Sequence, residues 1–173
     1  MIGDNAPDFE AMAYVHGRID KVKLDDYKGK WLIIVFYPED FSYVCPTEIQ
    51  EFARDYPSFL DKGAEIVAIS SDSEYTHRAW VMTDPRLKQV TYALVSDRSG
   101  EIAKSYGVLN GPRGEARRAL VIVDPSRIIR YMVISDNQVG RSTKETYRVL
   151  SALQTEQMCA ANWQPGQGTI EER

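Results

Sequence analysis

The chain has 173 residues, of which 43% are hydrophobic and 27% are charged, and its formal net charge is −4. This length and composition predict one globular domain with a sizeable hydrophobic core. The acidic balance provides no basic stripe for nucleic acid, and no apolar stretch reaches the roughly 18 residues that span a bilayer, so we expect neither nucleic-acid binding nor a membrane span.

Strands and helices alternate along the first half of the chain. The run Trp31–Tyr37 is almost continuously apolar, which is typical of a strand covered on both faces. Pro46 suits the first residue of a helix, because its missing N–H costs nothing there, and Gly63 suits the end. We expect strands at 9–15, 19–24, 31–37 and 64–70, the first two as a hairpin, and helices from 46 to about 62 and from a cap at 72 or 73 to about 82.

The second half has shorter elements and ends in an aperiodic segment. We expect strands at 92–95, 119–123 and 128–134, the last two as a hairpin, and helices at 99–107 and from Ser142 onward. Ser142 with Glu145 allows a capping box. The pattern predicts an α/β fold, a mixed central sheet flanked by helices. The predicted domain covers residues 1–155, and residues 156–173 form a C-terminal arm.

Cys45 stands where the apolar strand passes into the next helix, in the segment Pro38-Glu39-Asp40-Phe41-Ser42-Tyr43-Val44-Cys45-Pro46-Thr47-Glu48. At a helix N-terminus, unpaired N–H groups and the positive end of the dipole favour a thiolate, which is the nucleophilic form of cysteine. The other cysteine, Cys159, lies in the aperiodic arm. One activated and one mobile thiol suit a redox enzyme that works through a transient disulfide.

The number of cysteines bears on location and on metal binding. Two cysteines are too few for a secreted disulfide scaffold. The first residues are neither basic nor followed by an apolar segment, so no signal peptide is expected and a cytoplasmic protein is predicted. The chain has no CxxC and no paired Cys/His spacing, so we expect no metal site.

The segment around Cys45 strongly resembles the active-site motif of peroxiredoxins, P-x-x-x-T/S-x-x-C, and in particular that of the typical two-cysteine group, which includes the C component of alkyl hydroperoxide reductase. Further matches are Pro7-Asp8-Phe9, Thr76-His77-Arg78-Ala79-Trp80, Val95-Ser96-Asp97, Arg118-Ala119-Leu120-Val121-Ile122-Val123-Asp124-Pro125, Val139-Gly140-Arg141-Ser142 and Cys159-Ala160-Ala161-Asn162-Trp163. The resemblance implies a thioredoxin fold and a thiol-specific peroxidase that reduces hydrogen peroxide and organic hydroperoxides without a cofactor.

The resemblance assigns a role to each cysteine. Cys45 is the peroxidatic thiol, which becomes a sulfenic acid, and Cys159 is the resolving thiol, which condenses with it to a disulfide. Cys159 comes from the other protomer of a homodimer, and the dimers are expected to form a decamer-like ring. A disulfide needs Cα atoms within about 7 Å, so the first turn of the Cys45 helix must unwind. The expected electron donor is a thioredoxin-like protein or a flavoprotein disulfide reductase.

The resemblance also places polar residues around Cys45. Arg118 lies over the cysteine, where its guanidinium can hold the thiolate and polarise a peroxide oxygen. Ser42 donates a hydrogen bond to the peroxide or the thiolate, and Pro38 shields the loop. Glu48 and Arg141 are expected to orient Arg118.

Other interpretations stay open at several positions. A loop serine commonly closes a turn, a glutamate in the first helical turn suits the helix dipole, and Cys159 could be a free surface thiol. Arg117 is expected on the surface. His77 is interpreted as structural, although histidine suits general-base catalysis.

The whole protein also has rival interpretations, a thiol-disulfide exchange protein and a redox-regulated holdase. The missing CxxC disfavours the first, and the complete motif disfavours the second. The family's usual threonine is Ser42, and the proline common after the second cysteine is Ala160. A Gly-Gly-Leu-Gly insert of oxidation-sensitive members is missing between Asp84 and Ala93, and their C-terminal helix is not expected, so we expect resistance to excess peroxide.

Overall fold

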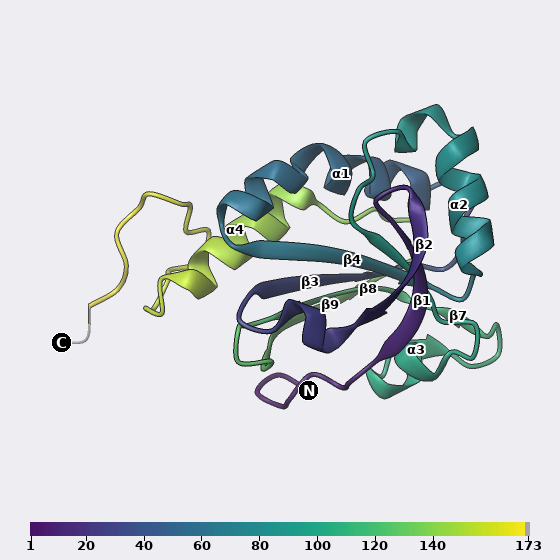
Figure 1. Cartoon of the computed structure of the whole chain (residues 1–173). Coiled ribbons are helices and arrows are strands. Elements are labelled where there is room, and N and C mark those ends of the chain that lie inside the picture. Colours follow the sequence, from purple (N-terminus) through teal and green to yellow (C-terminus); the bar gives the residue numbers. More distant parts are fainter. Residues whose placement is uncertain (172–173) are drawn as a thin grey trace. The chain divides into compact units, whose positions relative to one another are not determined.

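The computed structural model describes residues 1–171, and its first compact unit, Met1–Arg141, is built on a seven-stranded sheet (Figure 1). The strands are β1 (Glu10–Val15), β2 (Arg18–Lys23), β3 (Trp31–Phe36), β4 (Ala64–Ser70), β5 (Ala93–Ser96), β8 (Arg118–Val123) and β9 (Ile129–Ser135). They lie in the order β2-β1-β5-β4-β3-β8-β9. β3, β4 and β5 run parallel, and the other neighbours are antiparallel, so the predicted mixed sheet is confirmed.

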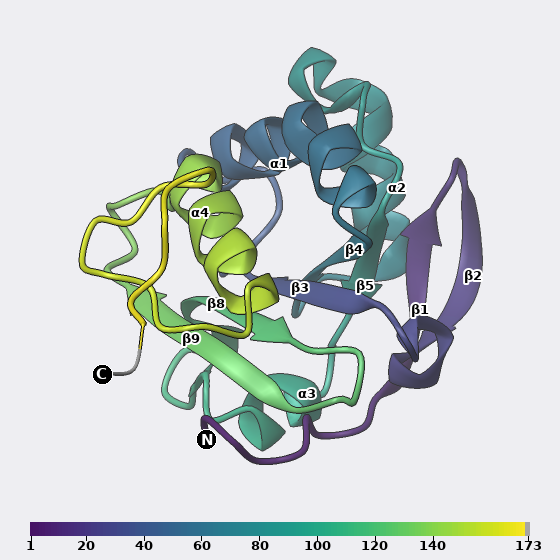
Figure 2. The same cartoon turned by 90° about the vertical axis from the view of Figure 1, so that its left-hand side faces the viewer.

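Helices cover both faces of this sheet. α1 (Cys45–Asp61) and α2 (Glu74–Thr83) lie on one face, and the short α3 (Glu101–Ser105) lies on the other (Figures 1 and 2). Two 3-10 turns, η1 (Leu24–Tyr27) and η2 (Pro85–Leu87), and a ribbon of β6 (Leu109–Asn110) with β7 (Glu115–Ala116) complete the unit. Across residues 1–171, every helix falls short of the length and apolar character that crossing a membrane requires.

The apolar run in β3 is explained by this two-sided cover. Side chains alternate across a strand, and Leu32, Ile34 and Phe36 pack in a core cluster with residues of the α3 side. The Phe36 ring lies 5.4 Å from that of Tyr106, which follows α3. Ile33 and Val35, which point to the α1 face, are equally buried. Because neither face meets water, the strand has no polar positions, as its sequence predicted.

The beginning of α1 is what positions Cys45. Val44 has helical backbone angles, with φ −83 and ψ −40. Its carbonyl accepts hydrogen bonds from the N–H groups of Thr47, at 3.1 Å, and Glu48, at 3.3 Å. The helix therefore starts at Cys45, just before the predicted start, and Pro46 takes the second position, where a missing N–H still costs nothing.

A second compact unit begins at Ser142 and contains α4 (Thr143–Gln154). The Ser142 hydroxyl caps this helix by accepting from the Glu145 N–H at 3.1 Å. The Glu145 carboxylate binds Arg148 instead of completing the predicted capping box. From the end of α4 to residue 171 the chain makes turns and a β-bridge between Met158 and Ile170. The predicted boundary between residues 155 and 156 stays a prediction.

Candidate active site

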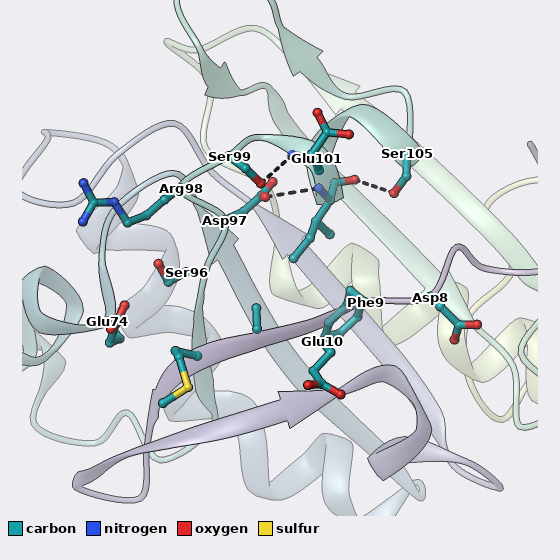
Figure 3. A pocket seen from close by; sticks show the side chains of 13 residues that line it. Asp8, Phe9, Glu10, Glu74, Ser96, Asp97, Arg98, Ser99, Glu101 and Ser105 are labelled. Carbon is teal, nitrogen blue, oxygen red and sulfur yellow. Dashed lines mark hydrogen bonds between the residues drawn. The ribbon is translucent and has the colours of Figure 1, made fainter.

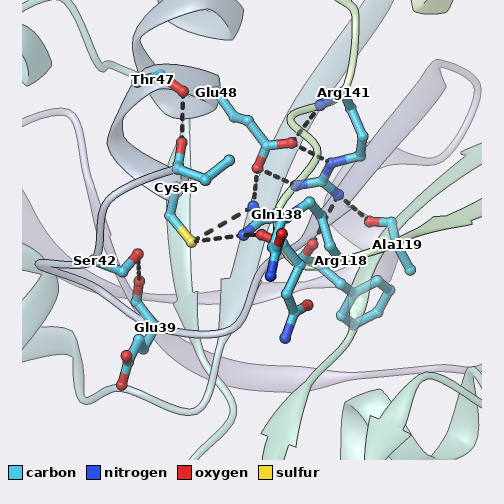
Figure 4. A network of polar contacts seen from close by, with 12 residues as sticks. Glu39, Ser42, Cys45, Thr47, Glu48, Arg118, Ala119, Gln138 and Arg141 are labelled. Atoms are coloured by element: carbon cyan, nitrogen blue, oxygen red, sulfur yellow. Dashed lines mark hydrogen bonds and ion pairs between the residues drawn. The ribbon is translucent and has the colours of Figure 1, made fainter.

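The start of α1 and the start of β8 bring Cys45 and Arg118 into direct contact (Figure 4). Cys45 is 1% exposed and Arg118 is 2% exposed. Both terminal nitrogens of the arginine, Nη1 and Nη2, donate to the sulfur of Cys45 at 3.6 Å. The predicted nucleophile and its predicted cation, far apart in the sequence, therefore face each other in a buried site.

The register of β8 explains why Arg118, and not its neighbour, reaches the thiol. β8 pairs with β3 so that Ala119 lies opposite Phe36, which places Arg118 beside the end of β3 where the chain turns toward α1. Side chains alternate along an extended strand, and Arg117 is exposed. The predicted inward and outward positions of the two arginines are as found.

Glu48, on the first turn of α1, holds two arginines at once. Its carboxylate accepts from Nη1 of Arg118 and from the backbone N–H, Nε and Nη2 of Arg141, at 2.7, 2.8 and 2.9 Å. Arg141 in turn donates to the backbone carbonyls of Phe36, at 2.8 Å, and Ala119. Glu48 thus links the Arg118 guanidinium over Cys45 to Arg141, which is itself bound to backbone carbonyls of β3 and β8.

The charges of this cluster favour an anion at Cys45. Burial alone raises the pKa of Glu48, but the hydrogen bonds and charge of Arg141, with the charge of Arg118, outweigh it and hold that pKa below its ordinary value. Two guanidinium cations and one carboxylate therefore leave one positive charge in a buried place. An unbalanced buried charge is costly, and a thiolate at Cys45 balances it.

A pocket of about 370 Å³ leads from the surface to Cys45 and Arg118. Pro38 and Ser42 are among the residues that line it. The Ser42 hydroxyl donates to the carbonyl of Glu39 at 3.0 Å, so it must rotate to serve a molecule in the pocket. Within residues 1–171, no group of three or more His, Cys, Asp and Glu side chains is placed to bind a metal ion.

The AhpC/TSA family model matches residues 2–132 of the chain. The chain belongs to this family. It is a thiol-specific peroxidase with the thioredoxin fold of peroxiredoxins, and the resemblance of its motifs to the alkyl hydroperoxide reductase group is confirmed.

Relatives and solved structures are similar along almost the entire chain. The mitochondrial thioredoxin-dependent peroxide reductase of Homo sapiens is 41% identical over 176 residues, which are 98% of this chain and 69% of that protein. The reduced 2-Cys peroxiredoxin of Plasmodium vivax has a TM-score of 0.92 and 33% identity, covering 97% of this chain and 91% of the other. AhpC of Enterococcus faecalis has a TM-score of 0.87 and 37% identity, covering 89% and 92%.

The second cysteine of this peroxiredoxin, Cys159, lies in the unit that begins at Ser142. Both cysteines are free thiols in this structure. Cys159 is half-buried, its sulfur 3.5 Å from the Thr155 hydroxyl and 3.9 Å from the carbonyl of Ala152 at the end of α4.

One contact in the site had no sequence signal. The backbone carbonyl of Asn137, in the loop after β9, accepts from Nη2 of Arg118 at 3.0 Å. Asn137 and Gln138 also line the pocket. A backbone contact does not depend on residue type, so no motif could have indicated it.

A larger pocket, of about 520 Å³, lies away from this site, beside β1 and α3 (Figure 3). Its lining is acidic, with Asp8, Glu10 and Glu101. The Asp97 carboxylate there accepts from the N–H groups at the start of α3 at 3.1 and 2.8 Å, and Glu10 pairs with Lys21 at 2.7 Å. No cysteine lines it, so it does not belong to the peroxidase site.

Proposed function

We propose that the enzyme reduces hydrogen peroxide and organic hydroperoxides to water and alcohols, through a sulfenic acid at Cys45 and a disulfide between Cys45 of one protomer and Cys159 of another. The observation that carries the proposal is the contact of the buried Cys45 sulfur with both terminal nitrogens of Arg118 at 3.6 Å. This contact stands at the end of a pocket that a small peroxide can enter.

The first step is a nucleophilic displacement at oxygen. The Cys45 thiolate attacks one oxygen of the peroxide, a sulfur–oxygen bond forms, and the oxygen–oxygen bond breaks. The sulfur loses two electrons and becomes a sulfenic acid, and the other oxygen leaves as alkoxide or hydroxide and takes up a proton. Arg118 donates to the sulfur and to the oxygens as negative charge moves from one to the other.

The surrounding residues prepare this step. Glu48 and Arg141 hold the guanidinium of Arg118 in place, so little reorganisation accompanies the reaction. Pro38 keeps the pocket wall rigid, because its φ is restricted. Ser42 turns its hydroxyl from the carbonyl of Glu39 to the bound peroxide, which supplies a further hydrogen bond.

The cycle is completed by the second thiol. The sulfur of Cys159 attacks the sulfenic sulfur, a disulfide forms, and water leaves. A dithiol protein then reduces the disulfide by thiol exchange. A thioredoxin-like donor is favoured over a flavoprotein reductase, because a relative of 41% identity is named for its dependence on thioredoxin. The active form is a homodimer within a decamer-like ring, in the cytoplasm.

Non-reducing electrophoresis after one equivalent of peroxide tests the disulfide. The unsubstituted enzyme is expected to form a covalent dimer, and neither Cys45→Ser nor Cys159→Ser alone is expected to do so. An equimolar mixture of the two variants, after exchange of protomers, should recover a dimer with a single disulfide. A covalent bond within one monomer would contradict the proposal, as would full turnover of Cys159→Ser with a dithiol reductant.

A further inference from the structure

A second buried polar network involves the segment between β3 and α1, and none of its residues forms a hydrogen bond with Cys45 or Arg118. The side chains of Asp40 and His77 are both 0% exposed, and Oδ2 of Asp40 lies 2.8 Å from Nδ1 of His77. The Tyr37 hydroxyl donates to Oδ1 of Asp40 at 2.7 Å. Asp40 belongs to the segment between β3 and α1 that also contains Ser42, whereas His77 belongs to α2.

The segment is held to the body of the protein at this point by its backbone as well. The N–H of Asp40 donates to Oδ2 of Asp72 at 2.8 Å, and the Ser70 hydroxyl donates to the same oxygen at 2.8 Å. The next residue, Phe41, has φ +56, a left-handed conformation that a bulky side chain rarely adopts. Such a conformation persists only when its surroundings impose it.

Geometry determines how many protons the Asp40–His77 pair holds. Nε2 of His77 lies 3.2 Å from the carbonyl of Val95, and because a carbonyl can only accept, Nε2 carries a hydrogen. Nδ1 and Oδ2, 2.8 Å apart, then share one further proton, either as carboxylic acid with imidazole or as carboxylate with imidazolium. Burial raises the pKa of Asp40, which favours the acid form. Both forms are neutral overall.

Exposure to water changes the number of protons that Asp40 and His77 hold. A carboxyl group in water is ionised above about pH 3.9, and an imidazole loses its extra proton near about pH 6.5. Above that pH, the exposed pair therefore holds one proton fewer than the buried pair. The titratable groups that face the pair are Tyr37 and Asp72, and β5 contributes only the Val95 carbonyl. Burial raises the pKa of Tyr37 well above its ordinary value, so it stays protonated.

The proposed disulfide requires the segment to open, because a sulfur in a residue that is 1% exposed cannot meet a thiol of another protomer. We propose that Asp40 and His77 are positioning residues that latch this segment closed through their shared proton, and that rising pH releases the latch. The inference rests on the disulfide cycle proposed above. When the latch is closed, Cys45 stays under Arg118, where it can react with peroxide. When the latch is open, the sulfenic acid at Cys45 is exposed to Cys159. Opening releases one proton above about pH 6.5, so the opening constant rises by up to about tenfold per pH unit.

Hydrogen exchange tests the latch without peroxide and without Cys159. The reference protein is Cys45→Ser, in which no thiol titrates at the site. Exchange of the peptide covering residues 38–49, corrected for the intrinsic pH dependence, is expected to show an opening constant that is flat below about pH 6.5 and about tenfold larger at pH 8 than at pH 7. A pH-independent opening of this reference protein overturns the proposal by itself.

Two further variants in that background separate the latch from packing. In Asp40→Asn the amide N–H can donate to Nδ1 where the acid did, with no proton to release, so between pH 7 and pH 8 opening is expected to lose its pH dependence. Tyr37→Phe removes one hydrogen bond to Asp40 but keeps the shared proton, so opening should increase while its pH dependence stays. The proposal is wrong if opening depends on pH equally in Asp40→Asn and in the reference protein. It is also wrong if residues 38–49 exchange only through global unfolding. Neither outcome bears on whether Cys45 reduces peroxide.

Discussion

Two buried polar networks border the segment that leads into α1, and they differ in how their charges respond to pH. Around Cys45, the Glu48 carboxylate is held by two guanidinium groups, which stay charged at every physiological pH. Around Asp40, the carboxyl group shares a proton with His77, and histidine is the side chain that titrates near neutrality. The first network suits a geometry that must persist through the reaction with peroxide, and the second suits a contact that must be broken afterwards.

Removing the cation over the sulfur is expected to have the largest effect. Arg118→Met should slow the reaction of Cys45 with peroxide by about 10²- to 10³-fold, the effect of losing one preorganised donor to a developing charge. Rapid-mixing fluorescence measures the rate, and circular dichroism checks that the fold is intact. Arg117→Met is the matched control, because Arg117 is exposed, and it should change the rate less than about twofold. If the two variants behave alike, the assignment of Arg118 is wrong.

Breaking the fixed network should also cost stability. Glu48→Gln leaves two buried guanidinium groups without their carboxylate, and urea unfolding is expected to show a loss of about 3 kcal/mol. Glu51→Gln is the control, because the carboxylate of this half-buried residue pairs with the exposed Arg54 of the same helix, and it should change the free energy of unfolding by less than about 1 kcal/mol. A small loss for Glu48→Gln would show that the cluster adds no net stability.

The pH dependence of the same variant has a definite sign. Because the pKa of Glu48 is lowered in the folded protein, its contribution to stability is fully present above the unfolded-state value of about 4.3 and is lost as the pH falls through the folded value. The difference in unfolding free energy between the enzyme and Glu48→Gln should therefore be constant near neutrality and shrink below about pH 4. A difference that grows on acidification would contradict the ionised state of Glu48.

Removing the Ser42 hydroxyl from the pocket wall should have a smaller effect than removing the charge of Arg118 or of Glu48. Ser42→Ala is expected to slow the peroxide step by about tenfold, because this is the usual effect of losing one hydrogen bond to a charged group. Ser42→Thr keeps the hydroxyl and should stay within about threefold of the unsubstituted rate. If the alanine variant is as fast as the threonine variant, the Ser42 hydroxyl serves only the turn, through its hydrogen bond to the carbonyl of Glu39.

Excess peroxide tests how readily the active-site segment opens. A sulfenic acid at Cys45 either meets Cys159 or is oxidised to sulfinic acid. The chain between Asp84 and Ala93 is occupied by the short turn η2 and carries no Gly-Gly-Leu-Gly insert, so no such insert adds to the contacts that hold the active-site segment closed. Mass spectrometry is expected to show sulfinic acid in only a minor fraction of Cys45 after hundreds of turnovers in millimolar peroxide, with Cys159→Ser as the sensitive control. Mostly sulfinic acid in the unsubstituted enzyme would show that opening is slow.

Much of the fold could be predicted because its elements leave local signals. The strand at residues 64–70 was predicted with the bounds that β4 has, since its apolar run ends at turn residues on both sides. The β6–β7 ribbon had no such signal, because strands of two residues have no periodicity. The capping box at Ser142 formed only in part, because the Glu145 carboxylate found a stronger partner in Arg148.

The sequence alone predicted the family, Cys45 as the candidate nucleophile and, through the resemblance, Arg118 as the inward-facing arginine, because these predictions depend on residue types at fixed spacing along a strand or at a helix start. Only the tertiary structure decided which distant groups meet. It brought Arg118 from β8 to the start of α1, gave Glu48 two arginine partners, and paired Asp40 with the buried His77. These contacts depend on strand order and register, and no local pattern in the chain specifies them.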